Sequence, residues 1–164
     1  MAKKKIAGVG TPATVALTAA GVPFAVHSYT HDPQASSYGM EAAEALGLPS
    51  EQVFKTLMAD VDGTLTVAVV PVTGTLDLKA LAVACGHKKA AMADPAAAQR
   101  RTGYVLGGIS PIGQRQASPT VVDESALLFQ TIFVSGGRRG FDVELAPGDL
   151  IRLSNATTAK IAHP

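Results

Sequence analysis

The spacing of apolar and polar residues predicts short helices and strands along the whole chain. Helices are expected where a capping residue precedes an apolar run that glycine or asparagine ends. They would cover residues 11–21, 36–48, 77–86, 94–103 and 147–155, with one further helical turn in 49–54. Strands are expected where apolar and polar residues alternate or β-branched residues cluster. They would cover residues 24–31, 88–93, 120–129, 131–137 and 141–146.

Residues 55–72 predict a β-hairpin. Asp62 and Gly63 form a two-residue turn signal, and apolar runs flank it on both sides. The stretch Val-Ala-Val-Val at 67–70 is apolar at every position, which indicates a central strand covered on both faces. The hairpin is antiparallel, whereas the intervening helices allow parallel pairing elsewhere. The fold class is therefore mixed α/β (α+β) with a mixed sheet.

The composition indicates one globular domain. The chain has 164 residues, of which 47% are apolar and only 5% aromatic, so Ala, Val, Leu and Ile must build the core. We expect a flexible basic tail at 1–10 and a single domain over 11–164. No apolar run approaches the roughly 20 residues of a membrane span. The single cysteine, Cys85, agrees with a reducing compartment, so we expect a cytoplasmic protein without membrane contact.

Positive charge is concentrated in the middle of the chain. Residues 86–140 carry seven basic and three acidic residues, a net charge of +4, although the whole chain carries only +1. A basic stretch in a nearly neutral chain suits a local phosphate-binding face. The alternative is a solvated surface with scattered charges. The small net charge argues against a protein that coats nucleic acid indiscriminately.

Lys55 stands within an apolar strand. By the two-residue period of a strand, it shares a face with Val53, Leu57 and Ala59. Its stem could cover the core while the ammonium reaches water. Alternatively, the ammonium lies at the edge of a pocket and faces a phosphate or a developing oxyanion. The spacing alone leaves both interpretations open.

Other candidate chemistry is weaker. Glycine-rich stretches at 102–111 and 135–142 could bring backbone N–H groups close to a ligand, but neither matches a P-loop or a dinucleotide fingerprint. His27 and His31 lie in a segment expected to be extended, without a cysteine or carboxylate cluster, so we expect no metal site and no cofactor. Cys85 ends an apolar helix in which Leu81, Ala82 and Val83 indicate packing, and it is expected to be a core residue.

Several motifs together resemble a known family. The stretches HSYTHDP, VFKTL, PVTGTLDLKALA, MADPAAAQRRTGYVLGGISPIGQ, TVVDESA and TIFVSGGRRGFDVELAPGDL are similar to those of YbaK-type Cys-tRNA(Pro) deacylases. This group includes the editing domain of bacterial prolyl-tRNA synthetase. The resemblance runs from about residue 11 to residue 150. The order K-T-L, GGISP, SGGRRG is more specific than any one of these motifs.

The resemblance implies a fold, an activity and a site. The fold would be a single domain with a barrel-like mixed sheet surrounded by helices. The activity would be hydrolysis, in trans, of the ester in mischarged Cys-tRNA(Pro), with the substrate's own thiol attacking its carbonyl. The partners would be mischarged tRNA(Pro) and prolyl-tRNA synthetase, without DNA. Carried over by position, the site would comprise Tyr29, Tyr38, Lys55, Thr56, Gly108, Ser135 and Asp142.

The implied roles differ among these residues. Lys55 and the backbone N–H of Gly108 would orient the ester, and Tyr29 and Tyr38 would enclose the aminoacyl-adenosine. Thr56, Ser135 and Asp142 would bind polar groups of the substrate. Relatives carry phenylalanine where this chain has Tyr38, so its hydroxyl has no assigned role. The tRNA backbone would contact Arg100, Arg101, Arg138 and Arg139.

Two alternatives stay open at this stage. The same fold could act on another mischarged tRNA, such as Ala-tRNA(Pro), for which a thiol-dependent mechanism would fail. The chain could instead be a non-catalytic module that binds tRNA or the synthetase and regulates it. In that case Lys55 would contribute to binding without turnover.

Overall fold

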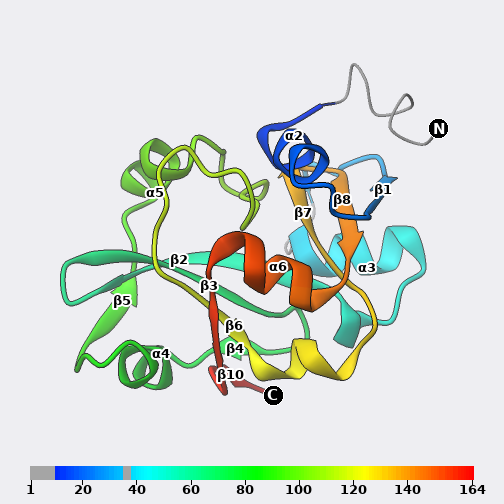
Figure 1. The fold of residues 1–164 in the computed structure, drawn as a ribbon. Coiled ribbons are helices and arrows are strands. Elements are labelled where there is room, and N and C mark those ends of the chain that lie inside the picture. Colours follow the sequence, from blue (N-terminus) through cyan, green and yellow to red (C-terminus); the bar gives the residue numbers. More distant parts are fainter. Residues whose placement is uncertain (1–9, 35–37) are drawn as a thin grey trace.

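A computed structural model describes residues 10–34 and 38–164, with only the backbone of residues 38 and 39 (Figure 1). The expected tail at 1–10 lies almost wholly outside the described residues. The strands form three sheets, with the orders β5-β2-β3-β6-β9, β1-β8-β7 and β10-β4. The mixed α/β fold class is confirmed, although the strands divide among these sheets. Within the described residues, no helix combines the length and apolar character that crossing a membrane requires.

The five-stranded sheet is the centre of the fold. It contains β2 (Phe54–Val61), β3 (Thr64–Pro71), β5 (Ala90–Met92), β6 (Thr120–Asp123) and β9 (Thr157–Ala159). The predicted hairpin is confirmed: β2 and β3 pair antiparallel, and Asp62 and Gly63 both have positive φ, as a tight hairpin turn requires. In contrast, β3 pairs with β6, and β6 with β9, in parallel. The sheet is therefore mixed, as expected.

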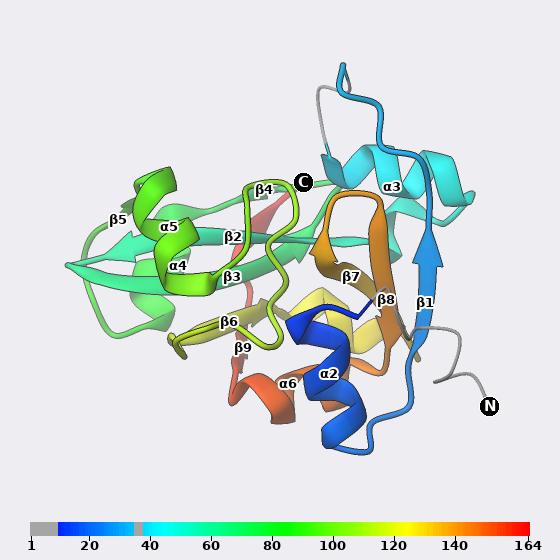
Figure 2. The same cartoon turned by 90° about the horizontal axis from the view of Figure 1, so that it is seen from above.

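Helices cover both faces of this sheet (Figures 1 and 2). One face packs against α2 (Pro12–Ala19), α5 (Pro95–Thr102) and α6 (Pro147–Ser154), and the other against α4 (Leu78–Ala84). In β3, Val67 and Val69 belong to the first core cluster, whereas Ala68 and Val70 belong to the second. The predicted central strand at 67–70 is thus buried on both sides, because neighbouring side chains alternate between the two faces.

The three-stranded sheet stands beside one end of β2. It contains β1 (Ala25–Ser28), β7 (Ile132–Arg138) and β8 (Phe141–Leu145), all antiparallel. A single parallel bridge, from Val53 to Phe133, joins it to the start of β2. Further along, β5 pairs only with Ala59–Val61 of β2, and the N–H of Ala93 donates to the Met58 carbonyl. Residues 55–57 therefore form a free strand edge between β7 and β5 in the described part of the chain.

The remaining elements include departures from the prediction. They are α3 (Tyr38–Leu46), the 3-10 helices η1 (Ser50–Gln52) and η2 (Glu124–Leu128), and the short strands β4 (Thr75–Leu76) and β10 (Ala162–His163). The strand expected at 120–129 was wrong beyond Asp123. The Asp123 carboxylate accepts from the N–H groups of Ser125 and Ile161, and it thereby starts η2 and holds the C-terminal segment. Neither β9 nor β10 was predicted.

Candidate functional site

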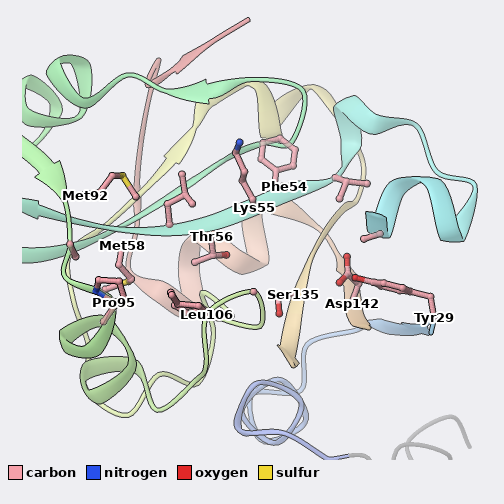
Figure 3. Close-up of a pocket in the computed structure, with 17 residues that line it drawn as sticks. Tyr29, Phe54, Lys55, Thr56, Met58, Met92, Pro95, Leu106, Ser135 and Asp142 are labelled. Atoms are coloured by element: carbon pink, nitrogen blue, oxygen red, sulfur yellow. The ribbon is translucent and has the colours of Figure 1, made fainter. Parts of the chain in front are cut away.

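A cavity of about 380 Å³ opens at the free edge of β2 (Figure 3). One wall comes from β5 and α5, and the opposite wall from β7, β8 and the chain after β1. Because the cavity follows a strand edge, side chains from both faces of β2 border it. It brings together five residues that the resemblance implied, namely Tyr29, Lys55, Thr56, Ser135 and Asp142. The Tyr38 side chain lies outside the described residues.

Lys55 borders the cavity without an internal partner. Its ammonium forms no hydrogen bond or ion pair with the residues that the structure describes. The side chain is half-buried, and this desolvation lowers the pKa of Lys55. Figure 3 shows it pointing away from Thr56, which extends from the opposite face of β2. An unpaired, partly desolvated cation at the edge of a cavity favours an anionic or strongly polar ligand.

Thr56 offers a buried hydroxyl to the same cavity. Its Oγ1 is fully buried and has no hydrogen-bond partner within the described residues. Leaving such a group unsatisfied costs roughly 1–3 kcal/mol. Thr56 lines the cavity, so the group next to the ligand site includes a buried hydroxyl whose hydrogen-bonding capacity is unused in the described structure.

Ser135, Asp142 and Tyr29 form the polar end of the cavity. Ser135 of β7 and Asp142 of β8 are directly opposed in the antiparallel register, so their side chains lie on one face. Tyr29 continues β1, and its N–H donates to the Gly140 carbonyl at 2.9 Å. Burial raises the pKa of Asp142 from its ordinary value of 3.8 to about 7. Burial, with the charge of Asp142 as the next cause, raises the pKa of Tyr29 to about 12.

The backbone N–H of Gly108 is engaged within the protein. Its N–H donates to the Val105 carbonyl at 2.9 Å, so it is not available to a ligand, and Gly108 is absent from the cavity wall. A Cβ at this position would lie 2.7 Å from the Cα of Arg138. Glycine is needed there because the loop touches the backbone of the β7–β8 turn. The neighbouring Gly107, with φ +83°, lines the cavity instead.

Residues that the sequence did not indicate fix the other wall. Leu106 lines the cavity, and its N–H donates to the Gln99 Oε1 at 3.0 Å. The Leu106 carbonyl accepts from Arg139 through Nε and Nη2, at 2.9 and 2.6 Å. Met58 and Met92 complete an apolar end. Tertiary contacts that side chains make across loops create this wall, so neither periodicity nor motif spacing could have predicted it.

Comparisons with known proteins identify the family. Residues 32–153 match the model of the aminoacyl-tRNA editing domain, and this range contains four of the five cavity residues that the resemblance implied. The chain belongs to this family. A relative in Enterococcus faecalis, named EbsC and described as a candidate Cys-tRNA(Pro)/Cys-tRNA(Cys) deacylase, is 42% identical over 120 residues, which are 73% of each chain. The resemblance inferred from the motifs is therefore confirmed.

Solved structures share the fold of this editing domain. The crystal structure of a candidate trans-editing enzyme for prolyl-tRNA synthetase superposes with a TM-score of 0.79 at 23% identity. It covers 93% of this chain and 96% of the other. The hypothetical protein APE2540 superposes with a TM-score of 0.82, also at 23% identity, over 93% of this chain and all of the other.

Some arginines of the editing domain make internal contacts. Arg101 donates to Ser118 Oγ at 3.0 Å, to Gln116 Oε1 at 2.8 Å and to the Ala117 carbonyl, which holds the loop after α5. Arg139 holds Leu106, as described above. The Arg138 guanidinium lies 5.0 Å from the centre of the Phe141 ring. Contacts of these residues and of the exposed Arg100 with tRNA stay a prediction.

Cys85 lies outside the cavity of the editing domain. It is the C-terminal cap of α4 and packs, partly buried, against the second core cluster. Burial raises the pKa of its thiol, which disfavours the nucleophilic thiolate. Leu81 and Ala82 are buried as expected, but Val83 is 68% exposed, so the expectation that it packs in the core was wrong. The α4 helix turns Val83 away from the sheet.

Proposed function

We propose that this editing domain is a trans-editing hydrolase that deacylates mischarged Cys-tRNA(Pro). Membership of the family, the 42% identical deacylase relative and a cavity that holds several polar groups support this proposal. A synthetase pocket rejects a side chain of similar size by only about 1–3 kcal/mol. A separate enzyme that cleaves the incorrect ester compensates for this weak discrimination. We extend the proposal to delivery of the substrate by prolyl-tRNA synthetase.

The observation that carries the mechanism is the chemistry of the cavity wall. It offers groups that can orient an ester, yet no cysteine or histidine is among the described side chains that line it. Its one serine, Ser135, accepts the Gly137 N–H at 3.2 Å and forms no hydrogen bond with the opposed Asp142 carboxylate, the group in the wall that could serve as its base. A protein nucleophile needs such a base or a lowered pKa. The attacking group is therefore assigned to the substrate.

In the proposed reaction, the substrate thiol attacks its own ester carbonyl. A sulfur–carbon bond forms, the bond from the carbonyl carbon to the ribose oxygen breaks, and the thiol proton passes to that oxygen. The products are free tRNA and a cysteine thiolactone, which water opens to cysteine. The protein contributes positioning, which can lower a barrier by about 7–11 kcal/mol.

Each polar group of the cavity has a place in this reaction. The Lys55 ammonium stabilises the negative charge that develops on the carbonyl oxygen. The unpartnered Thr56 hydroxyl binds the ribose of the terminal adenosine. Asp142, whose pKa is about 7, binds the substrate ammonium as a carboxylate, since an adjacent cation favours its ionised form. Tyr29 covers the aminoacyl group next to Asp142.

One comparison of substrates tests the proposal. Purified protein is incubated with labelled Cys-tRNA(Pro), Ala-tRNA(Pro) and Pro-tRNA(Pro), and the ester that remains is measured over time. Cleavage of Cys-tRNA(Pro) alone is expected. Equal cleavage of Ala-tRNA(Pro) would exclude the thiol mechanism, and tRNA binding without cleavage of any ester would indicate a regulatory module.

A further inference from the structure

A second groove lies on the far side of Met92 from the cavity. It has a volume of about 540 Å³ and runs between α4, β5 and the turn of the β2–β3 hairpin. Three exposed lysines line it, Lys79 of α4 and Lys88 and Lys89 before β5. We call it the lysine groove. The three elements gather at one end of the molecule in both ribbon views (Figures 1 and 2).

The two carboxylates of the lysine groove are engaged within the protein. Asp60 Oδ1 accepts the Gly63 N–H at 2.7 Å. Asp62 Oδ2 accepts the backbone N–H groups of Lys88 and Lys89, at 3.0 and 3.5 Å, and lies 3.4 Å from His87. These bonds and the charges of His87 and Lys89 lower the pKa of Asp62, with the Lys88 N–H as the largest cause. The aspartates thus fix the loop, while Lys79 and Lys88 form no ion pair with any described residue.

The lysine groove and the cavity adjoin at Met92. Met92 lines both, and its side chain is 52% exposed. Alternation along β2 places Lys55, Leu57 and Ala59 on one face, and Ala59 packs in the same cluster as Leu81 of α4. Lys55 therefore points to the face of the sheet that carries α4 and Lys79. A chain that leaves the cavity past Met92 meets cations along its path.

The opposite end of the cavity has acidic groups near Tyr29. Residues 6–54 contain no lysine or arginine, whereas Asp32, Glu41, Glu44 and Glu51 lie within this range. Glu41 also raises the pKa of Tyr29 as the third cause, so its charge reaches the cavity wall. At the Tyr29 end the Asp142 and Glu41 carboxylates lie near Arg138 and Arg139 of the β7–β8 turn, whereas the Met92 end leads to three exposed lysines that attract a polyanion. The charge distribution therefore gives a bound nucleic-acid strand a direction.

We propose that the lysine groove binds the phosphate backbone of the tRNA acceptor strand whose aminoacylated end occupies the cavity. This inference rests on the proposed function. The terminal nucleotide passes over Met92, and the preceding phosphates lie along Lys79, Lys88 and Lys89. Lysines act here as point charges without base contacts, so the lysine groove contributes affinity and direction but no sequence preference.

The test compares two substrates in the variant Lys79→Gln/Lys88→Gln/Lys89→Gln. Full-length Cys-tRNA(Pro) carries the backbone, whereas cysteinyl-adenosine carries only the ester and the terminal nucleoside. We expect kcat/KM for the tRNA to fall about tenfold or more at physiological salt, and the slope of log affinity against log salt to decrease by about 2 to 3. Cleavage of cysteinyl-adenosine should be unchanged. Lys160→Gln is the control, because Lys160 is exposed and follows β9 at the sheet edge opposite to β5.

Each result has a defined meaning. Unchanged kcat/KM and salt slope in the triple variant, or an equal loss on both substrates, would overturn the inference. If kcat/KM for the tRNA falls in Arg100→Gln/Arg138→Gln but not in the triple lysine variant, the arginines bind the tRNA backbone and the inference is wrong. If the parent protein cleaves neither ester, the proposed function fails. In that case, filter binding of uncharged tRNA to the parent and the triple variant tests separately whether the lysine groove binds tRNA. Equal affinities would overturn the inference.

Discussion

Lys55 and Thr56 are neighbours in β2, yet their side chains leave opposite faces of the strand and border the same cavity (Figure 3). This arrangement is possible because residues 55–57 form a free strand edge, so one opening reaches both faces. An ester lying across the edge can contact an ammonium and a hydroxyl from consecutive residues. A pocket on a single face of a sheet would receive only alternate side chains.

Replacement of Lys55 tests its role in the reaction. Lys55→Ala should lower the rate of Cys-tRNA(Pro) cleavage by about 10²–10³-fold, which corresponds to about 2.7–4 kcal/mol. The thermal unfolding midpoint should stay close to that of the parent, because the ammonium has no partner among the described residues. Lys55→Arg should also be impaired, since the planar guanidinium of arginine does not replace the compact ammonium of lysine. Near-parental activity in folded Lys55→Ala would exclude the assignment.

Thr56 should show opposite effects on stability and activity. Thr56→Val keeps the shape and removes a buried hydroxyl that has no partner in the described part of the chain. We expect urea unfolding to show unchanged or increased stability, by up to roughly 1–3 kcal/mol, together with a reduced cleavage rate. Thr56→Ser should retain most activity. A stable Thr56→Val variant with full activity would show that the substrate does not use this hydroxyl.

Asp142 should make stability depend on pH. Its pKa is raised from 3.8 to about 7 in the folded state, so the unfolded chain binds fewer protons between these values. The stability contribution of the protonated form is complete below about pH 4 and is lost as the pH rises through 7, with a slope of up to about 1.4 kcal/mol per pH unit. Asp142→Asn should remove this dependence and lower cleavage.

Urea unfolding from pH 5 to pH 8.5 measures this effect. The stability gain of Asp142→Asn over the parent should grow towards pH 7 and level off above it. Glu124→Gln, at an exposed position on η2, serves as the control. A stability difference that is the same at every pH would contradict a raised pKa for Asp142.

Gly108→Ala should destabilise the protein through a backbone clash. The added Cβ would lie 2.7 Å from the Arg138 Cα and 2.9 Å from its carbonyl carbon, and neither atom can move independently. The expected loss in unfolding free energy is about 1–3 kcal/mol. Gly148→Ala in α6, where a Cβ would meet no atom within 4 Å, should be neutral or stabilising. Equal stability of the two variants would refute the close contact.

The attacking thiol can be located by blocking one thiol at a time. Cys85→Ala should cost about 1 kcal/mol of stability and little activity, because Cys85 packs outside the cavity. Alkylation of the thiol on Cys-tRNA(Pro) should stop cleavage while binding persists. Loss of activity in folded Cys85→Ala, or normal cleavage of the alkylated substrate, would reject the substrate-assisted mechanism.

Local signals in the sequence predicted local structure well. Thr11, Asp77 and Asp94 cap their helices through the N–H groups three residues ahead, as their positions indicated. The Asp62-Gly63 turn fixed the hairpin register. Each of these features depends on contacts within a few residues. Asp123 shows the limit, since its bond to the distant Ile161 N–H could not be read from the strand pattern.

The cavity is formed by tertiary contacts, which the pattern of apolar and polar residues does not predict. The opposition of Ser135 and Asp142 follows from strand register, and the position of Leu106 follows from bonds to Gln99 and Arg139. The family motifs named several of these positions but did not show which groups were available. The N–H of Gly108, engaged with Val105, is the example.

The short free edge of β2 also bears on self-association. Unpaired strand edges invite sheet extension by other chains, which leads to aggregates. Here the opening is confined to residues 55–57 by the Val53–Phe133 bridge at one end and by the Ala93–Met58 bond at the other. A typical strand of about five or six residues does not fit into it. Lys55, the first residue of this opening, adds a charge there, so the position proposed to bind the substrate also disfavours polymerisation along this edge.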